Sequence, residues 1–108
     1  MKVLTIGGSN SDKSINRQLA NFAASLIPDA DITTYDLSRY ELPIFSTQRE
    51  EVDGIPQLAK DFATMIDGTD LLIVSLAEHN GSYCAGFKNL IDWISRIADR
   101  KAWGQKPM

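Results

Sequence analysis

Residues 70–97, DLLIVSLAEHNGSYCAGFKNLIDWISRI, contain a strand, a loop and a helix in one run. Residues 70–76 are almost purely apolar, which is typical of a central parallel strand that helices cover on both faces. A polar loop follows at residues 77–82. After it, apolar residues recur at helical spacing: Phe87, Leu90, Ile91, Ile94 and Ile97. The stretch therefore predicts a strand–loop–helix unit, with residues 87–97 as the helix.

The beginning of the chain shows the same alternation. Residues 2–6 form a short apolar run rich in β-branched side chains, which predicts a buried strand. From residue 14 onward the pattern predicts a helix that packs on the sheet. Its apolar positions at helical spacing are Ile15, Leu19, Phe22, Ala23 and Leu26.

The middle of the chain supplies a second strand and a second helix. Residues 32–37 alternate in polarity like an edge strand, and residues 41–53 form a long irregular segment that contains Pro43. Residues 54–67 return to helical spacing, with Pro56 in the first turn, where its missing N–H costs nothing. The order of elements is therefore strand, helix, strand, helix, strand, helix.

Repeated strand–helix units predict a single α/β domain with a parallel sheet and right-handed crossovers. Ligands of such sheets bind outside the carboxyl ends of the strands. Two polar loops, at residues 7–13 and 77–82, each follow a predicted strand. We therefore expect both loops to lie at the binding edge of the sheet.

Composition places the chain among ordinary globular proteins. Hydrophobic residues make up 44% of it and charged residues 23%, which is enough for a packed core. The net charge of -3, with scattered basic residues, provides no positive field for nucleic acid. Cys84 is the only cysteine, and no apolar stretch approaches the roughly 20 residues of a membrane-spanning helix. We expect a cytoplasmic protein that binds neither nucleic acid nor membranes.

The loop at residues 7–16 has the form of an anion site. Its two glycines allow close backbone approach, and the free N–H groups and the positive dipole end of the next helix converge there. The side-chain donors are Ser9, Ser11, Ser14 and Asn16. The loop lacks the lysine of a nucleoside-triphosphate loop and the three glycines of a dinucleotide fingerprint, which favours a monophosphate. The alternative is that Ser14 only caps the helix and the loop is a solvated turn.

Residues 77–93, AEHNGSYCAGFKNLIDW, are similar to the PEYNGS…KN.IDW signature of the NADPH-dependent FMN reductase family. Pairs of residues after the second strand, at 36–37 and 42–43, also resemble family positions. The family's first motif, a glycine–serine pair with a spaced serine and asparagine before leucine–alanine, matches Gly8, Ser9, Ser14, Asn16, Leu19 and Ala20. The resemblance covers the whole chain.

The resemblance implies a flavodoxin-like three-layer α/β/α fold with five parallel strands. Residues 1–108 supply only the first three strand–helix units, so we expect a domain truncated before strand four, with the C-terminal strands missing. The third strand would then be an exposed edge that is prone to pair with another chain. A fragment, a natural truncation and an assembly with a second chain are all compatible with this sequence.

The same resemblance implies an FMN site formed by both loops. Ser9, Ser14 and Asn16 would hold the FMN phosphate, and residues 78–81 would border the isoalloxazine ring. With their neighbours in the two loops, the predicted cofactor-binding residues are Ser9, Ser11, Ser14, Asn16, Ala77, Glu78, His79, Asn80, Gly81 and Ser82. Three of these differ from the usual family residue: Ser11 replaces arginine, Ala77 replaces proline and His79 replaces tyrosine.

Some residues of the second motif also have simpler interpretations. Glu78 is either a simple surface charge or, as we expect, a carboxylate that fixes its loop by accepting backbone hydrogen bonds. His79 is either a planar group beside the flavin or an exposed loop histidine with no role. Cys84 is expected to be a small packing residue. A family helix that commonly lies at a dimer interface is matched by Lys88, Asn89, Asp92 and Trp93, although a solvated helix face explains the charges equally well.

The implied function is that of a flavin-dependent NAD(P)H oxidoreductase, an FMN reductase or a quinone-type or azo-type reductase. Hydride would pass from NADPH to bound FMN and then to a small-molecule acceptor. Because the flavin carries this chemistry, no catalytic side chain is assigned, and neither a metal site nor a nucleophilic triad is expected. We expect a homo-dimer or homo-tetramer. The alternative function is a flavin-free flavodoxin-like interaction module or an inactive fragment.

Overall fold

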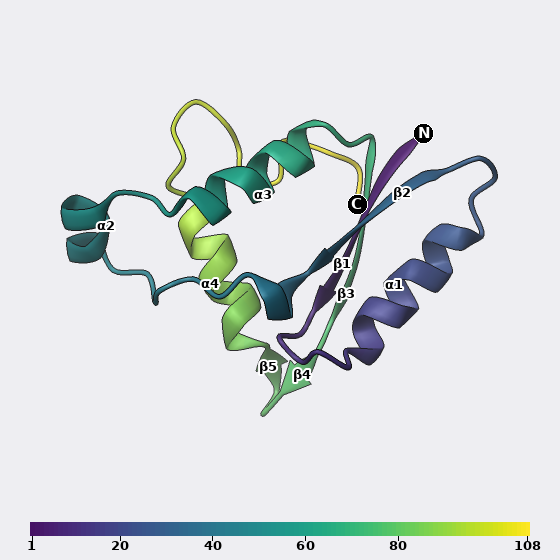
Figure 1. Ribbon diagram of the computed structural model, residues 1–108, viewed down its shortest axis with the longest axis horizontal. Coiled ribbons are helices and arrows are strands. Elements are labelled where there is room, and N and C mark those ends of the chain that lie inside the picture. The colour runs from purple at the N-terminus through teal and green to yellow at the C-terminus, as the bar shows by residue number, and fades with distance from the viewer.

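Three parallel strands form the sheet of the computed structural model, which describes all 108 residues (Figure 1). The strands are β1 (Lys2–Gly8), β2 (Asp31–Asp36) and β3 (Leu71–Leu76). β1 lies in the middle, in the order β2-β1-β3. The register sets Gly7 beside Asp36 and Gly8 beside Leu76. The carboxyl ends of all three strands therefore meet at one edge.

Helices cover both faces of this sheet. One face carries α1 (Ile15–Ser25), and the other carries α3 (Gln57–Asp67) and α4 (Ala85–Ile94) (Figure 1). The shorter elements are the 3-10 turn η1 (Leu37–Arg39), the helix α2 (Thr47–Asp53) and the strands β4 (Glu78–His79) and β5 (Ser82–Tyr83). None of the helices is both long enough and apolar enough to cross a membrane. The arrangement confirms the predicted parallel three-layer α/β/α fold.

The larger part of the core lies between the sheet and the layer of α3 and α4. Leu4 and Ile6 of β1 are fully buried on this side, together with Phe62 of α3 and Trp93 of α4. The ring of Phe62 packs against that of Tyr35 with a centroid distance of 4.4 Å. Burial of these large side chains provides most of the hydrophobic stabilisation of the fold.

The predicted contact face of α1 is wrong. Four of the predicted contact residues are more than half exposed: Ile15, Leu19, Phe22 and Leu26. The buried residues of the helix are instead Ala20 and Ala24. The physical reason is that this face of the sheet is polar, because the hydroxyls of Thr5 and Thr34 donate hydrogen bonds to the side-chain oxygen of Asn21. Small alanines bring the helix close enough to make these bonds.

Element boundaries differ from the prediction in three other places. The segment predicted to be irregular contains α2, which begins where the Ser46 hydroxyl accepts a hydrogen bond from the Arg49 N–H. Pro56 is the N-cap of α3 and precedes its first turn. Finally, α4 spans residues 85–94 instead of 87–97. The structure thus adds α2 to the predicted elements and moves the ends of α3 and α4 by a few residues, while the order of the three main strands and the helices that follow them is as predicted.

β3 has no strand on its outer side. Its middle is half-buried, and the side chain of Leu76 is 47% exposed, as expected for a partly uncovered third strand. The N–H of Leu72 donates a hydrogen bond of 2.9 Å to the carbonyl oxygen of Pro107. The C-terminal residues therefore make one backbone hydrogen bond to this edge.

Candidate functional site

The first loop, residues 9–14, is held together by its own serine side chains. The Ser9 hydroxyl oxygen accepts a hydrogen bond from the Ser11 N–H at 3.1 Å, and the Ser11 hydroxyl accepts from the N–H two residues further on at 3.2 Å. Ser14 is the N-cap of α1 and accepts from the Arg17 N–H at 3.0 Å. Each hydroxyl thus uses an oxygen lone pair within the loop and keeps its O–H as a donor. Three such donors at a helix N-terminus suit a phosphate group.

Asn16 lies in the first turn of α1, and β3 sets the orientation of its amide. The Ser75 hydroxyl donates to the Asn16 side-chain oxygen at 2.8 Å. Because this oxygen is engaged, the amide presents its NH2 group as the remaining polar end, which is a donor. The sequence predicted a donor at Asn16 without its partner, because Ser75 is 59 residues away and the contact depends on how β3 pairs with β1.

Gly7 and Gly8 allow β1 to end directly beneath the first loop. A Cβ atom on Gly7 would lie 2.5 Å from the backbone nitrogen of Arg17, and one on Gly8 would lie 2.7 Å from Leu76 Cδ2. Gly7 is therefore required by its contact with the backbone of α1, whereas a Cβ atom on Gly8 would have to displace the end of the partly exposed Leu76 side chain. The close approach seen here is to neighbouring elements of the chain itself, and the predicted approach to a bound anion stays a prediction.

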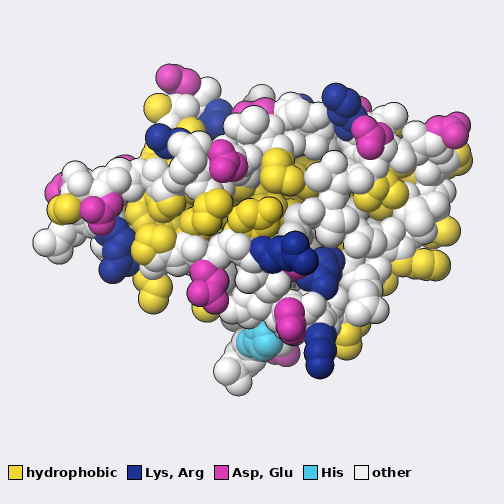
Figure 2. Space-filling view, in the orientation of Figure 1, with side chains coloured by type: hydrophobic (Ala, Val, Ile, Leu, Met, Phe, Trp, Pro, Cys, Tyr) yellow, Lys and Arg dark blue, Asp and Glu magenta, His cyan; other side chains and the backbone are white.

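A charged cluster lies beside the first loop, where Figure 2 shows basic side chains over η1 and the start of α1. Arg17 Nη1 is 2.7 Å from Asp36 Oδ1, and Arg17 Nη2 donates to the Asp12 carbonyl at 2.8 Å. Asp36 also accepts from the N–H and hydroxyl of Ser38 and pairs with Arg39. Burial favours the neutral acid, but the Ser38 hydrogen bonds and both arginines outweigh it and hold the pKa of Asp36 below its usual value. The two cations and one anion leave a net positive charge beside the loop.

The second loop is a tight hairpin in place of the predicted plain polar loop. β4 and β5 pair antiparallel, and Asn80 and Gly81 form the turn between them with φ angles of 53° and 81°. An Asn-Gly pair is the sequence signal for this turn, because both positions need left-handed backbone. The Glu78 carboxylate accepts a hydrogen bond from the Gly81 N–H, which confirms its predicted role in fixing the loop.

The two loops meet at the carboxyl edge of the sheet. The Ala77 N–H donates to the Gly8 carbonyl oxygen at 3.3 Å. Proline, the usual family residue at this position, has no N–H and cannot make this bond. Cys84 is buried among core residues, as predicted, and its Sγ lies 3.7 Å from Asn10 Oδ1. The replacement at Ala77 therefore allows the start of the second loop to bond to the end of β1, next to the first loop.

The predicted site residues fall into two groups. One group lies at the ends of β1 and β3 and at the start of α1, and is buried or half-buried: Ser9, Ser14, Asn16 and Ala77. The other group is exposed and comprises Ser11 and residues 78–82. The hairpin extends beyond the end of β3 in Figure 1, and the chain's only histidine lies at this tip in Figure 2. Both interpretations of His79 stay predictions.

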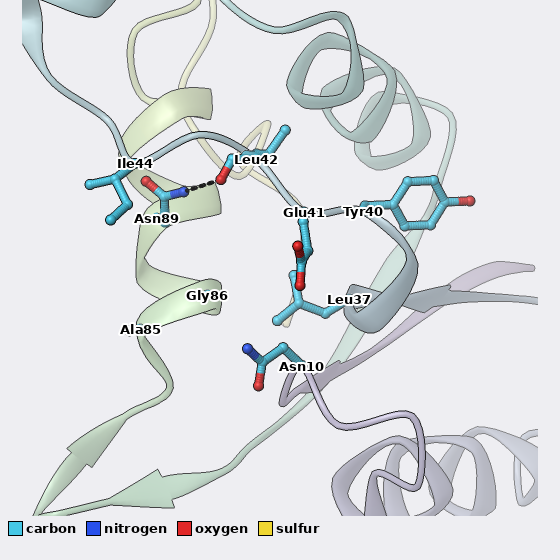
Figure 3. A pocket seen from close by; sticks show the side chains of 9 residues that line it. All are labelled: Asn10, Leu37, Tyr40, Glu41, Leu42, Ile44, Ala85, Gly86 and Asn89. Atoms are coloured by element: carbon cyan, nitrogen blue, oxygen red, sulfur yellow. Dashed lines mark hydrogen bonds between the residues drawn. The ribbon is translucent and has the colours of Figure 1, made fainter.

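A pocket of about 200 Å³ opens beside the first loop (Figure 3). Its lining comes from the first loop, the segment after β2 and the start of α4: Asn10, Leu37, Tyr40, Glu41, Leu42, Ile44, Ala85, Gly86 and Asn89. None of residues 77–82 lines it, and it is smaller than the roughly 300 Å³ of an ordinary small-molecule site. The pocket therefore adjoins the two loops and is too small to hold a whole flavin.

Two residues of the helix expected at a dimer interface act within the chain. The Asn89 amide donates to two carbonyls of residues 42–45 and accepts one N–H from the same segment. Trp93 is fully buried and donates its indole N–H to this segment at 2.7 Å. These two side chains anchor the connection between η1 and α2. The outer face of α4 retains the ion pair of Lys88 and Asp92.

Comparison with known proteins identifies the family to which these two loops belong. The family described as NADPH-dependent FMN reductase matches residues 1–108. The chain belongs to this family. A 2-hydroxy-1,4-benzoquinone reductase from Burkholderia sp is 33% identical over 108 residues, which cover 99% of this chain and 57% of the relative. An FMN-dependent NADPH-azoreductase from Staphylococcus haemolyticus is 32% identical over 101 residues, which cover 88% of this chain and 53% of the relative.

A solved structure shares the fold of this FMN reductase family member. A flavoenzyme NAD(P)H:(acceptor) oxidoreductase from Paracoccus denitrificans matches with a TM-score of 0.76 at 23% identity, over 98% of this chain and 57% of that one. The family resemblance and the flavodoxin-like fold inferred from the sequence are thereby confirmed. The chain spans a little more than half the length of the relatives that it matches.

Proposed function

We propose that this chain forms the flavin-binding part of an NAD(P)H:acceptor oxidoreductase that uses FMN and NADPH. The observation that carries the proposal is the donor set of the first loop, in which serine hydroxyls and the Asn16 amide keep free donors beside a helix N-terminus. Membership in the FMN reductase family supports the same assignment. When bound, FMN supplies the redox chemistry, because it takes hydride from reduced nicotinamide and passes electrons to an acceptor.

In this proposal the chain's own residues bind and orient. Ser9, Ser14 and Asn16 hold the phosphate through neutral donors, with Ser11 beside them, and the positive end of α1 favours the dianion. Residues 78–81 border the ring, with Ala77 and Ser82 beside them. The hydrogen bond from the start of the second loop to Gly8 fixes the position of that loop relative to the end of β1. The Glu78 contact holds the hairpin turn. No side chain is assigned to proton transfer.

A quinone or an azo compound is the proposed electron acceptor. The support comes from the two relatives, which are named as a benzoquinone reductase and an azoreductase.

We also propose a cytoplasmic location and a homo-dimer or homo-tetramer, with the outer face of α4 around Lys88 and Asp92 at the interface. The excess of acidic residues, with a net charge of -3, supports the absence of a nucleic-acid partner.

We further propose that additional residues continue the sheet beyond β3 and complete the flavin site. The relatives are nearly twice as long as the matched region. Beside the open edge of β3 lies a hollow of about 350 Å³ lined only by hydrophobic residues: Val74, Leu76, Tyr83, Phe87, Ile91, Trp103 and Met108. A further strand paired with β3 would bury these side chains.

Titration of the purified chain with FMN, followed by flavin fluorescence, tests the proposed function. Riboflavin, which lacks the phosphate, is the comparison ligand, and we expect FMN to bind more tightly. Asn16→Ala should reduce this preference, because it removes a phosphate donor. Gln18→Ala is the matched control, since Gln18 is exposed on the same helix. Asn80→Gly keeps the left-handed turn and should weaken both flavins equally.

Two outcomes would contradict the flavin assignment. One is a folded chain that binds no FMN, which would show that residues 1–108 do not form a flavin site by themselves and would favour a flavin-free interaction module or an inactive fragment. The other is equal affinity for FMN and riboflavin, which would leave the first loop without a role in phosphate binding. The mass in solution, measured by light scattering in the same samples, tests the proposed oligomer.

A further inference from the structure

The side chain of Arg17 connects the first loop to the end of β2. Arg17 lies in the first turn of α1, Asp36 is the last residue of β2, and Asp12 lies in the loop that leads from β1 to α1. One guanidinium nitrogen is 2.7 Å from the Asp36 carboxylate, and another donates to the Asp12 carbonyl oxygen at 2.8 Å. A single side chain thus contacts an acceptor in the loop and an acceptor on the sheet.

The positive charge of Arg17 in the first turn of α1 needs a compensating negative charge. A cation in the first turn of a helix opposes the helix dipole. Arg17 Nη1 is buried and lies close to Asp36, but the two groups do not form a well-aligned hydrogen bond. The negative charge of the Asp36 carboxylate is therefore what stabilises this buried guanidinium nitrogen. Asp36 is itself fixed by two hydrogen bonds from Ser38. The side chains of Arg17 and Asp36 are each only 22% exposed, which limits their screening by solvent.

We propose that Arg17 and Asp36 are positioning residues for the FMN phosphate, which hold residues 9–14 in the conformation that presents the serine donors. This inference rests on the proposed function. Neither residue contacts the phosphate in it, because both ends of the Arg17 guanidinium are engaged by Asp36 and Asp12. The contact between Arg17 and Asp36 affects phosphate binding only by fixing the conformation of residues 9–14.

The effect of substituting Asp36 distinguishes this proposal from simple electrostatic attraction. If the cluster acted only through its charge, Asp36→Asn would remove a negative charge near the phosphate and would strengthen FMN binding. If Asp36 holds the loop through Arg17, the same change releases the arginine and weakens FMN binding. Arg17→Lys provides an independent test, because lysine keeps the charge but does not bridge two acceptors in the planar geometry of a guanidinium.

Dissociation constants for FMN and riboflavin provide the first measurement. We expect Arg17→Lys and Asp36→Asn to weaken FMN binding by about 5- to 20-fold, with riboflavin changed by less than about twofold. The matched control is Arg39→Ala. Its side chain also pairs with Asp36, but it is 79% exposed and makes no hydrogen bond to residues 9–14, so it should change neither affinity by more than about twofold.

Backbone order in the flavin-free chain provides a second measurement that does not depend on binding. In Arg17→Lys, nitrogen-15 order parameters of residues 9–14 should fall from about 0.85 to below about 0.6, whereas Arg39→Ala should leave them unchanged.

Stronger or unchanged FMN binding in Asp36→Asn would overturn the proposal. If the wild-type chain shows no preference for FMN over riboflavin, the proposed function fails, and the order parameters alone then decide whether Arg17 positions the loop.

Discussion

The two faces of the sheet are stabilised in different ways. The face under α3 and α4 is dry and aromatic, with Phe62 and Trp93 fully buried in a cluster of 14 buried residues. The face under α1 is polar, because Thr5 and Thr34 donate hydrogen bonds to Asn21 and only two alanines of the helix are buried. The difference shows that the first face supplies most of the folding energy, whereas the second sets the position of α1 and of the first loop.

The largest effect is expected on the aromatic face. Trp93→Ala should destabilise the chain by about 3–5 kcal/mol, because it leaves a large cavity and removes the indole hydrogen bond to Pro43. Urea denaturation measures the change. Phe22→Ala is the control on the other side of the molecule, since Phe22 is 63% exposed, and it should stay within about 0.5 kcal/mol. Comparable losses in the two variants would remove the contrast between the faces.

The next effect concerns the contact between β1 and α1. Gly7→Ala should cost about 1–3 kcal/mol, because the new methyl group would meet the backbone of Arg17 and push the helix away. Denaturation gives the cost, and amide chemical shifts of residues 9–14 report the displaced loop. Gly86→Ala is the control, since its added carbon would lie 3.6 Å from the nearest atom and alanine favours a helix. A stable Gly7→Ala chain with unchanged shifts would contradict the close packing.

A smaller effect is expected from the polar contact of α1 with the sheet. Asn21→Ala should cost about 1 kcal/mol, because the hydroxyls of Thr5 and Thr34 lose their shared acceptor but can still bond to each other. The free energy of unfolding is the measured quantity, with the exposed Gln18→Ala as a neutral reference on the same helix. No difference between these two variants would mean that the alanine contacts alone hold α1.

The smallest effect has the opposite sign. The Tyr35 hydroxyl is buried without a hydrogen-bond partner, and burial, assisted by Tyr40 and Asp61, raises its pKa, so the phenol stays neutral. Tyr35→Phe should therefore leave stability unchanged or raise it by up to about 1 kcal/mol, since it removes an unsatisfied polar group from the aromatic face. Thermal unfolding measures the difference, and a clear loss of stability would reveal a partner for the hydroxyl.

The parts of the fold that depend on local pattern were predictable. The apolar run of β3, the polar loops after β1 and β3 and the existence of the main helices follow from periodicity within a few residues of each position. The orientation of α1 was not predictable in this way. Periodicity indicates that Phe22 and its neighbours share one helical face, but the polar side chains of the sheet decide which face packs, and they bring Ala20 and Ala24 inward.

The amino-acid sequence by itself determined the order of the three main strands and their helices, the parallel class of the sheet and the two loops with the family motifs, because these are short-range patterns. Only the tertiary structure decided that Ser75 orients Asn16, that the second loop is linked to Gly8 and that Arg17 reaches Asp36. Each of these contacts joins residues from different segments. Their geometry arises from strand register and helix packing, which no local pattern of residues encodes.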